Sequence, residues 1–473
     1  MSSRREALPW SNHPTRELAR LAWPIAVSMV SYALMTLADT FFVARLGTSA
    51  LAGVGFGGTA AFFLLCFSFG LLRGVQIRTS VAVGAGRREQ AGSVLDAGVL
   101  LAGGMGALTL GLGLLLAEVV PSLMVSQGAA LHARGYLLVR LLAAPLVLIA
   151  VALRQSRTGQ GDVHHPMVAA LLANGLNIAL DALFILGLEW GPEGAAWASD
   201  IAALVEAAYL LRVALRAGWR PGTARWPVVR GVLSLGVPTG LHFLLEMGSF
   251  AALTALLARM PEVELAAHQI ALQVTHFSFL PAAAVGEAAS TLVGQAVGGH
   301  RDDLVRPLAR RALLGASLYT GAWTLGFAFG APLIVSVFTG EAELAGVAVR
   351  LLWVAAVFQV FDGANVVGRS ALRGTGDVRV PAVVGVVTAW VLVPPLAWWL
   401  GLHLGFGALG GWLGLCVELI LGAAVYWARV ERGGWLASAR RTRASVAERD
   451  PGEAVNVNVD VYVDLEGEPR EAA

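Results

Sequence analysis

Long apolar runs alternate with short polar stretches along almost the whole chain. They fall near residues 18–44, 51–72, 94–116, 135–153, 167–188, 194–215, 232–258, 266–293, 312–338, 347–368, 381–400 and 405–428. A helix needs about 20 apolar residues to cross a bilayer. Each run is too long for one strand, and open strand edges are not tolerated in lipid. The pattern therefore predicts an all-α membrane protein with twelve transmembrane helices.

The composition supports this prediction and excludes an ordinary soluble fold. Hydrophobic residues make up 56% of the chain and charged residues only 14%, whereas a soluble domain carries about 25% charged residues. The 56 glycines are typical of membrane helices that pack closely. The net charge of +2 gives no reason to expect a nucleic-acid partner. The expected surroundings are a lipid bilayer.

The first half of the sequence recurs in the second half. The paired landmarks are Pro24 with Pro238, Gly84 with Gly298, Gly161 with Gly376, and Trp197 with Trp412. Each pair is 214 or 215 positions apart, which spans six predicted helices. Because six is even, both halves enter the membrane in the same orientation. Parallel repeats of this kind occur in secondary transporters, where the substrate site lies between the halves.

The basic residues predict the orientation in the membrane. All 34 are arginines. If the N-terminus is inside, the loops predicted on that side hold most of them, including Arg73, Arg154 and Arg369. The opposite side has few, such as Arg45 and Arg259. Cytoplasmic loops carry an excess of basic residues, so both termini are expected in the cytoplasm.

The repeat and the charge pattern together predict five segments. They are a cytoplasmic N-terminal segment (1–17), a first lobe of six helices (18–215), a cytoplasmic linker (216–231), a second lobe of six helices (232–428) and a cytoplasmic tail (429–473). The polar tail is predicted to be disordered. A substrate site is expected between the two lobes.

Polar residues inside the predicted spans are candidates for function, since such groups are expensive in lipid. In the first half, Asp39 lies late in the first span. Asn177 and Asp181 in the fifth span are four positions apart and share one helix face. Their oxygens could bind a cation or share a proton, with Ser199 adding a neutral oxygen. Asn174, on the same span, is a further candidate.

In the second half, Glu246 and Asp362 lie deep in apolar runs and are candidates for ion coupling or substrate binding. His242, one turn before Glu246, and Glu287 are further candidates. Glu418 is assigned a structural or interfacial role. The sequence has no metal-ligand spacing, no phosphate-binding glycine loop and no nucleophile motif. No cofactor is therefore expected, and no metal beyond Na⁺ at the coupling sites.

Several motifs occur in the order and spacing of a known family. They are LADTFFVARLGTSALAGVG, NIALDALFILGLEWGPEGAAWAS, AAHQIALQV, VGQAVGG and FQVFDGANVVGRSALRGTGD. Together they resemble the MATE family, the multidrug and toxic compound extrusion transporters. The resemblance covers residues 18–428.

The resemblance implies a fold of two six-helix bundles facing a central cavity. Asp39, Asn177 and Asp181 match the family's first-lobe cation or proton site, with Ser199 where other members often have Thr. Glu246 and Asp362 match the second-lobe carboxylates of NorM-like members. The implied activity is antiport in the cell inner membrane, exporting amphipathic or cationic organic compounds in exchange for H⁺ or Na⁺. The protein is expected to be a monomer.

Two alternatives remain open at this point. One is a flippase for lipid-linked substrates, for which a more cationic cavity is expected, whereas the arginines here are predicted in loops. The other is a membrane-embedded enzyme. An enzyme would need a paired nucleophile and base, or metal ligands, at membrane depth, and the sequence shows neither.

Overall fold

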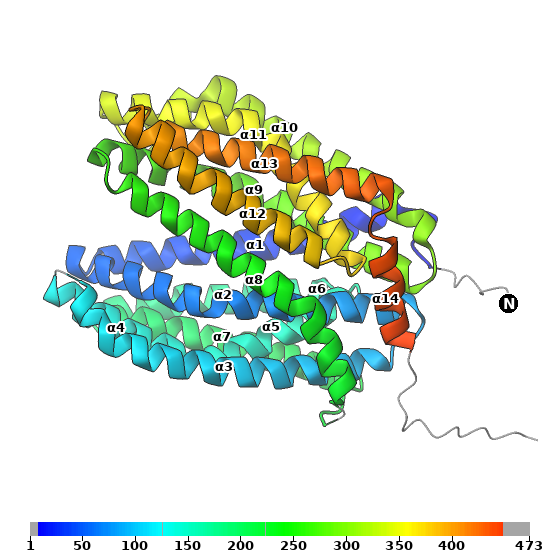
Figure 1. The fold of residues 1–473 in the computed structure, drawn as a ribbon. Coiled ribbons are helices and arrows are strands. Elements are labelled where there is room, and N and C mark those ends of the chain that lie inside the picture. The colour runs from blue at the N-terminus through cyan, green and yellow to red at the C-terminus, as the bar shows by residue number, and fades with distance from the viewer. Residues whose placement is uncertain (1–7, 125, 223, 448–473) are drawn as a thin grey trace, which may run out of the picture.

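The structure of the protein is a computed structural model that describes residues 8–124, 126–222 and 224–447. Helices dominate it (Figure 1). Those of the first half are α1 (Pro14–Ala44), α2 (Thr48–Gly84), α3 (Gln90–Leu123), α4 (Gln127–Leu142), α5 (Ala144–Gly159), α6 (His164–Asp181), the π-helix η1 (Ala182–Gly187) and α7 (Pro192–Arg216). Those of the second half are α8 (Trp226–Leu257), α9 (Glu262–Gly298), the short η2 (Asp302–Leu304), α10 (Val305–Ser336), α11 (Ala342–Gly374), α12 (Arg379–Leu396), the π-helix η3 (Ala397–His403), α13 (Ala408–Arg432) and α14 (Leu436–Ala447).

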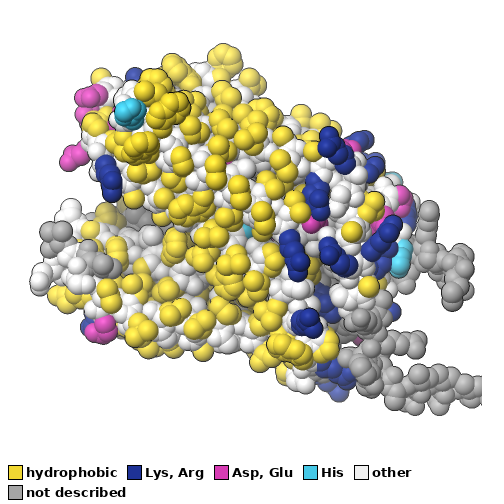
Figure 2. Space-filling model, in the orientation of Figure 1, with side chains coloured by type: hydrophobic (Ala, Val, Ile, Leu, Met, Phe, Trp, Pro, Cys, Tyr) yellow, Lys and Arg dark blue, Asp and Glu magenta, His cyan; other side chains and the backbone are white. Residues whose placement is uncertain are grey.

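The prediction of an all-α membrane protein is confirmed. Within the described ranges, ten helices are long and apolar enough to cross a membrane, or eleven if α4 and α5, bent by 50°, form one span. The 25-residue helix α7 is not among them; it carries the buried acids Asp200 and Glu206. Hydrophobic side chains cover the visible middle of the molecule, and charged ones gather mainly at its ends (Figure 2).

The repeat seen in the sequence is present in the helices. The helices α2 and α9 both have 37 residues, and α7 and α13 both have 25. The helices α6 and α12 have 18 residues each, and both continue into a π-helix. The bent pair α4–α5 corresponds to the continuous helix α11.

The first helix of each half packs against the other half. Helix α1 lies on α6 of its own half and on α9 of the other, while α8 lies on α12 of its own half and on α2 of the other. In Figure 1, α8 crosses the front of the molecule between the two groups of helices. The described part of the N-terminus and α14 lie at one end of the bundle, which we call the α14 end.

The backbones of the two halves approach closely where α2 and α9 cross near the α14 end. A Cβ atom added at Gly84 would lie 2.0 Å from the backbone oxygen of Gln295, and one added at Gly298 would lie 2.0 Å from the backbone oxygen of Val81. Gly84 and Gly298 are repeat-related, and so are Val81 and Gln295. Small residues let helix backbones come this close, so the crossing depends on both glycines.

Replacing Gly84 with Ala is expected to lower thermal stability. The added methyl group meets backbone atoms that cannot rotate away, so the helices must separate, at about 1–3 kcal/mol. Gly103→Ala in α3 is the matched control, because a Cβ at Gly103 meets no atom of the described residues within 4 Å. Melting temperatures of the purified proteins check this, and equal values for the two variants would contradict it.

The chain does not become disordered at residue 429. Helix α13 continues to Arg432, and α14 packs against α2 and α9. Its Ala439 and Val446, with the preceding Trp435, are buried. These apolar residues are spaced for one helix face, a pattern that the polar average composition of this segment conceals. The rest of the predicted tail, residues 448–473, lies outside the described residues.

Helix α14 bridges the two halves. From the first half, the Arg87 guanidinium donates to the backbone oxygen of Val446 at 2.7 Å. From α14, the Arg443 guanidinium donates to the backbone oxygen of Val297 in the second half at 2.8 Å. Both contacts lie where α2 and α9 end, so α14 covers the end of this crossing.

Candidate functional site

The structure brings the first-half candidates together from three helices. Asp39 comes from α1, Asn177 and Asp181 from α6, and Ser199 from α7; we call these four residues the first-half cluster. Asn177 and Asp181 are fully buried. The Asn177 amide donates to Ser199 Oγ at 3.2 Å, and the Asp39 side chain is close enough to Asp181 and Asn177 to interact electrostatically with them.

The oxygens of this cluster have few donors. Among the described residues, Asp39 Oδ1, Asn177 Oδ1 and both carboxyl oxygens of Asp181 are buried without a hydrogen-bond partner. Buried polar atoms are normally paired. Two neighbouring carboxyls can be satisfied if they share a proton, or if a cation lies between them. Within the described ranges, no three His, Cys, Asp or Glu residues are grouped to hold a metal ion.

Neighbouring side chains fix the first-half cluster in place. The Asn174 amide donates to Ser31 Oγ at 2.8 Å and so ties α6 to α1. The Arg140 guanidinium of α4 interacts electrostatically with Asp39 but is ion-paired with Asp200. This region thus contains three carboxyl groups, those of Asp39, Asp181 and Asp200, but only the Arg140 guanidinium as a basic group among the residues named here.

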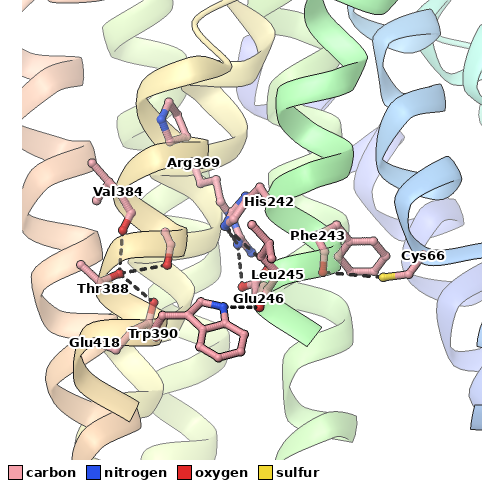
Figure 3. Close-up of polar contacts among 12 residues, drawn as sticks. Cys66, His242, Phe243, Leu245, Glu246, Arg369, Val384, Thr388, Trp390 and Glu418 are labelled. Carbon is pink, nitrogen blue, oxygen red and sulfur yellow. Dashed lines mark hydrogen bonds and ion pairs between the residues drawn. The ribbon is translucent and has the colours of Figure 1, made fainter. Parts of the chain in front are cut away.

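Glu246 in the second half has a basic partner. Arg369 Nη1 donates to Glu246 Oε1 at 2.8 Å, and His242 Nε2 lies 3.8 Å from Glu246 Oε2 (Figure 3). The Arg369 guanidinium reaches from α11 to α8, where His242 is almost fully buried. The negative charge of Glu246 is therefore already compensated by the protein.

Asp362 and Glu418 complete a second-half cluster with Glu246, Arg369 and His242. Both acids interact electrostatically with Glu246. Thr388 Oγ1 donates to Glu418 Oε1 at 3.4 Å (Figure 3). Glu418 was assigned a structural role from the sequence, yet it lies among the candidate acids. Its position near the middle of the last apolar run was the signal that could have found it.

Three arginines predicted in loops lie within helices. Arg73 of α2, Arg154 of α5 and Arg369 of α11 each pair with a buried or partly buried acid. Arg73 Nη1 lies 3.0 Å from Glu287 Oε2, so the further candidate Glu287 also has a basic partner. The loop prediction was wrong because the helices continue well beyond the ends of the apolar runs.

Arg154 and Arg369 occupy the same position in the repeat, 215 residues apart. Arg154 Nη2 lies 2.8 Å from Glu206 Oε1, and its guanidinium lies over the Tyr32 ring, 5.0 Å from the centroid. Tyr32 and Glu246 are 214 residues apart. In each half, therefore, an arginine of the fourth span lies against the same level of the first helix of that half. The acid that pairs with this arginine comes from α7 in the first half and from α8 in the second.

The chain is similar to known transporters over most of its length. The MatE family model matches residues 24–183 and 238–399. A probable multidrug resistance protein NorM from Pseudomonas putida is 30% identical over 433 residues, covering 87% of this chain and 93% of that protein. A protein of the same name from Deinococcus radiodurans is 33% identical over 423 residues, covering 86% and 92%.

The fold also matches a solved structure. That of the eukaryotic MATE transporter AtDTX14 aligns with a TM-score of 0.83 at 18% identity, covering 92% of this chain and 99% of that one. Members of the family are transporters, so the alternative of a membrane-embedded enzyme is dropped. The family model covers both repeats, and the chain therefore belongs to the MATE family of membrane transporters and is NorM-like.

Proposed function

We propose that this multidrug efflux transporter is a secondary antiporter that exports amphipathic, cationic organic compounds in exchange for H⁺ or Na⁺. The observation that carries the proposal is the carboxyl pair of Asp39 and Asp181, whose buried oxygens lack donors among the described residues. Two such groups cannot both stay charged in a low dielectric without a large penalty. Uptake of a proton or Na⁺ removes this penalty, and the free energy that is released can drive a change in the shape of the transporter.

The same reasoning assigns coupling to the first half and substrate binding to the second. Glu246 already has Arg369 as its counter-charge, so it does not need a coupling ion. Asp362 and Glu418, without an ion pair among the described residues, are left to attract a cationic substrate. Alternating access then moves the lobes 18–215 and 232–428, which the linker 216–231 joins, around a site between them.

We place twelve spans in this transporter, with α7 and the bent α4–α5 pair included. The equal lengths of α7 and α13 support counting α7 as a span. We also place both termini in the cytoplasm of a cell whose inner membrane holds the protein. A phosphatase that is active only outside the cytoplasm, fused after Ala447, should be inactive; an active fusion would reverse the orientation.

Everted membrane vesicles test the transport proposal. They should accumulate a fluorescent cationic dye when a proton or Na⁺ gradient is imposed, and imposing each gradient alone identifies the coupling ion. Dye uptake equal to that of vesicles without the protein, under both gradients, would reject the antiporter.

A flippase for lipid-linked anionic substrates is the second candidate. Arg373 is buried in α11 and interacts electrostatically with Arg73 and Arg369, so the helices hold more positive charge than the sequence suggested. Inhibition of dye uptake by an anionic lipid-linked sugar, or its movement between leaflets in proteoliposomes without dye transport, would favour this candidate.

A further inference from the structure

A pocket of about 380 Å³ opens at the α14 end, away from both candidate clusters. It lies between the first turns of α8, the turn from α11 to α12, the end of α13, and α14. Its polar lining includes Ser234, Arg379, Arg429, Ser438, Arg441 and Thr442.

The pocket lining carries more positive than negative charge. Among the described residues that line it, the only acid is Asp377, which is ion-paired with Arg429 at 2.5 Å. Among the described residues, Arg379 has no hydrogen bond or ion pair, and Arg441 donates only to Ser438 Oγ, at 3.2 Å. Two guanidinium groups are therefore available to bind an anion, and hydroxyl groups stand beside them.

The start of α12 adds backbone donors to the same space. This 18-residue helix begins at Arg379, and no side chain in the part of the chain that the structure describes caps its N-terminus. Val378 and Val380 line the pocket. Free backbone N–H groups and the helix dipole favour a phosphate at such a position, and arginine guanidinium groups bind phosphate oxygens in pairs.

The surroundings of the pocket indicate which kind of molecule would carry a phosphate bound there. Val383, Val387 and Val391 form a stripe along α12, and each is more than half exposed. The stripe runs along the helix away from the pocket. In Figure 2, basic side chains gather where the hydrophobic belt ends, near α12 and α14 of Figure 1. Basic pockets between spans at this level bind anionic lipid head groups.

We propose that this pocket binds the phosphate head group of an anionic phospholipid, whose acyl chains lie along the valine stripe of α12. The bound head group contacts the α12 N-terminus and α14 together. It thereby holds α14 across the ends of α2 and α9. This site is separate from the transport proposal, and its tests do not measure transport.

The full-length protein in nanodiscs provides the test. In phosphatidylcholine alone it should melt at a lower temperature than in phosphatidylcholine mixed with phosphatidylglycerol. Native mass spectrometry should find one phosphatidylglycerol that stays bound. An arginine at an anionic lipid surface contributes about fivefold in affinity. The double variant Arg379→Gln/Arg441→Gln should therefore bind the lipid about 25-fold more weakly.

The matched control is Arg440→Gln, an exposed arginine of α14 that does not line the pocket, and it should bind as the unchanged protein does. Ser234→Phe fills the pocket from α8 without changing charge and should also abolish retention. Should the double variant misfold, this second variant decides the matter. Equal lipid retention by both pocket variants and the control would overturn the site. Competition by inorganic phosphate or glycerol phosphate as strong as that by the lipid would overturn the lipid assignment.

Discussion

Asp39→Asn should abolish ion-driven export while leaving the protein folded. An amide can neither release a proton nor carry the charge that a cation compensates. Asp181 therefore loses the carboxyl group with which it would share a proton or bind a cation. A carboxylate within a membrane span is worth up to about 2.5–3.5 kcal/mol. This corresponds to about a hundredfold change in the balance between two states, and we expect gradient-driven dye uptake to fall by a similar factor.

The decisive measurement compares driven and undriven steps in the same vesicles. Dye binding and exchange of dye for dye should persist in Asp39→Asn, because the second-half cluster is unchanged. Asp303→Asn, at a side chain that is about half exposed, is the matched control and should transport normally. If Asp39→Asn keeps full gradient-driven uptake at equal expression, the first-half cluster does not couple transport.

Arg369→Gln should destabilise the protein, and a second substitution should restore it. Without the guanidinium, Glu246 loses its arginine partner, while the acids Asp362 and Glu418 remain close to it. Breaking a buried ion pair costs about 3–5 kcal/mol. The Glu246 side chain is 25% exposed, so we expect about 2 kcal/mol, in view of partial solvent screening.

The double variant Glu246→Gln/Arg369→Gln separates charge balance from packing. If Arg369 acts as the counter-ion of Glu246, the double variant should melt above Arg369→Gln, and the coupling energy from the cycle should be of the order of 1–2 kcal/mol. Arg432→Gln, at the exposed end of α13, controls for loss of a positive charge. Additive effects of the two substitutions would remove Arg369 from this role.

The fold was more predictable than the site. The apolar runs follow from the solvent, since lipid requires each span to satisfy its own backbone, and the 214-residue repeat can be read directly by comparing the two halves of the sequence. The spacing of Asn177 and Asp181 also sufficed to place both on one face, because a helix fixes that geometry locally. The structure then added Asp39 and Ser199 from other helices, as the family resemblance implied.

The partners of the acids could not be read from the sequence. Arg73 and Arg369 each follow directly on an apolar run, so both were assigned to loops, although α2 and α11 continue past them. Which acid each arginine meets depends on how helices far apart in the chain pack together. Helix α14 was missed because its apolar face can be recognised as buried only when the ends of α2 and α9, against which it packs, are known.

The ion pair between Arg73 and Glu287 bears on how the duplicated halves diverged. These residues occupy the same repeat position, 214 apart, and they contact each other, so the position lies on the axis that relates the halves. In a symmetric dimer of identical chains, a residue on the axis faces its own copy. Arginine would face arginine, or glutamate would face glutamate. The attractive pair became available only when one gene encoded both copies, which could then change independently.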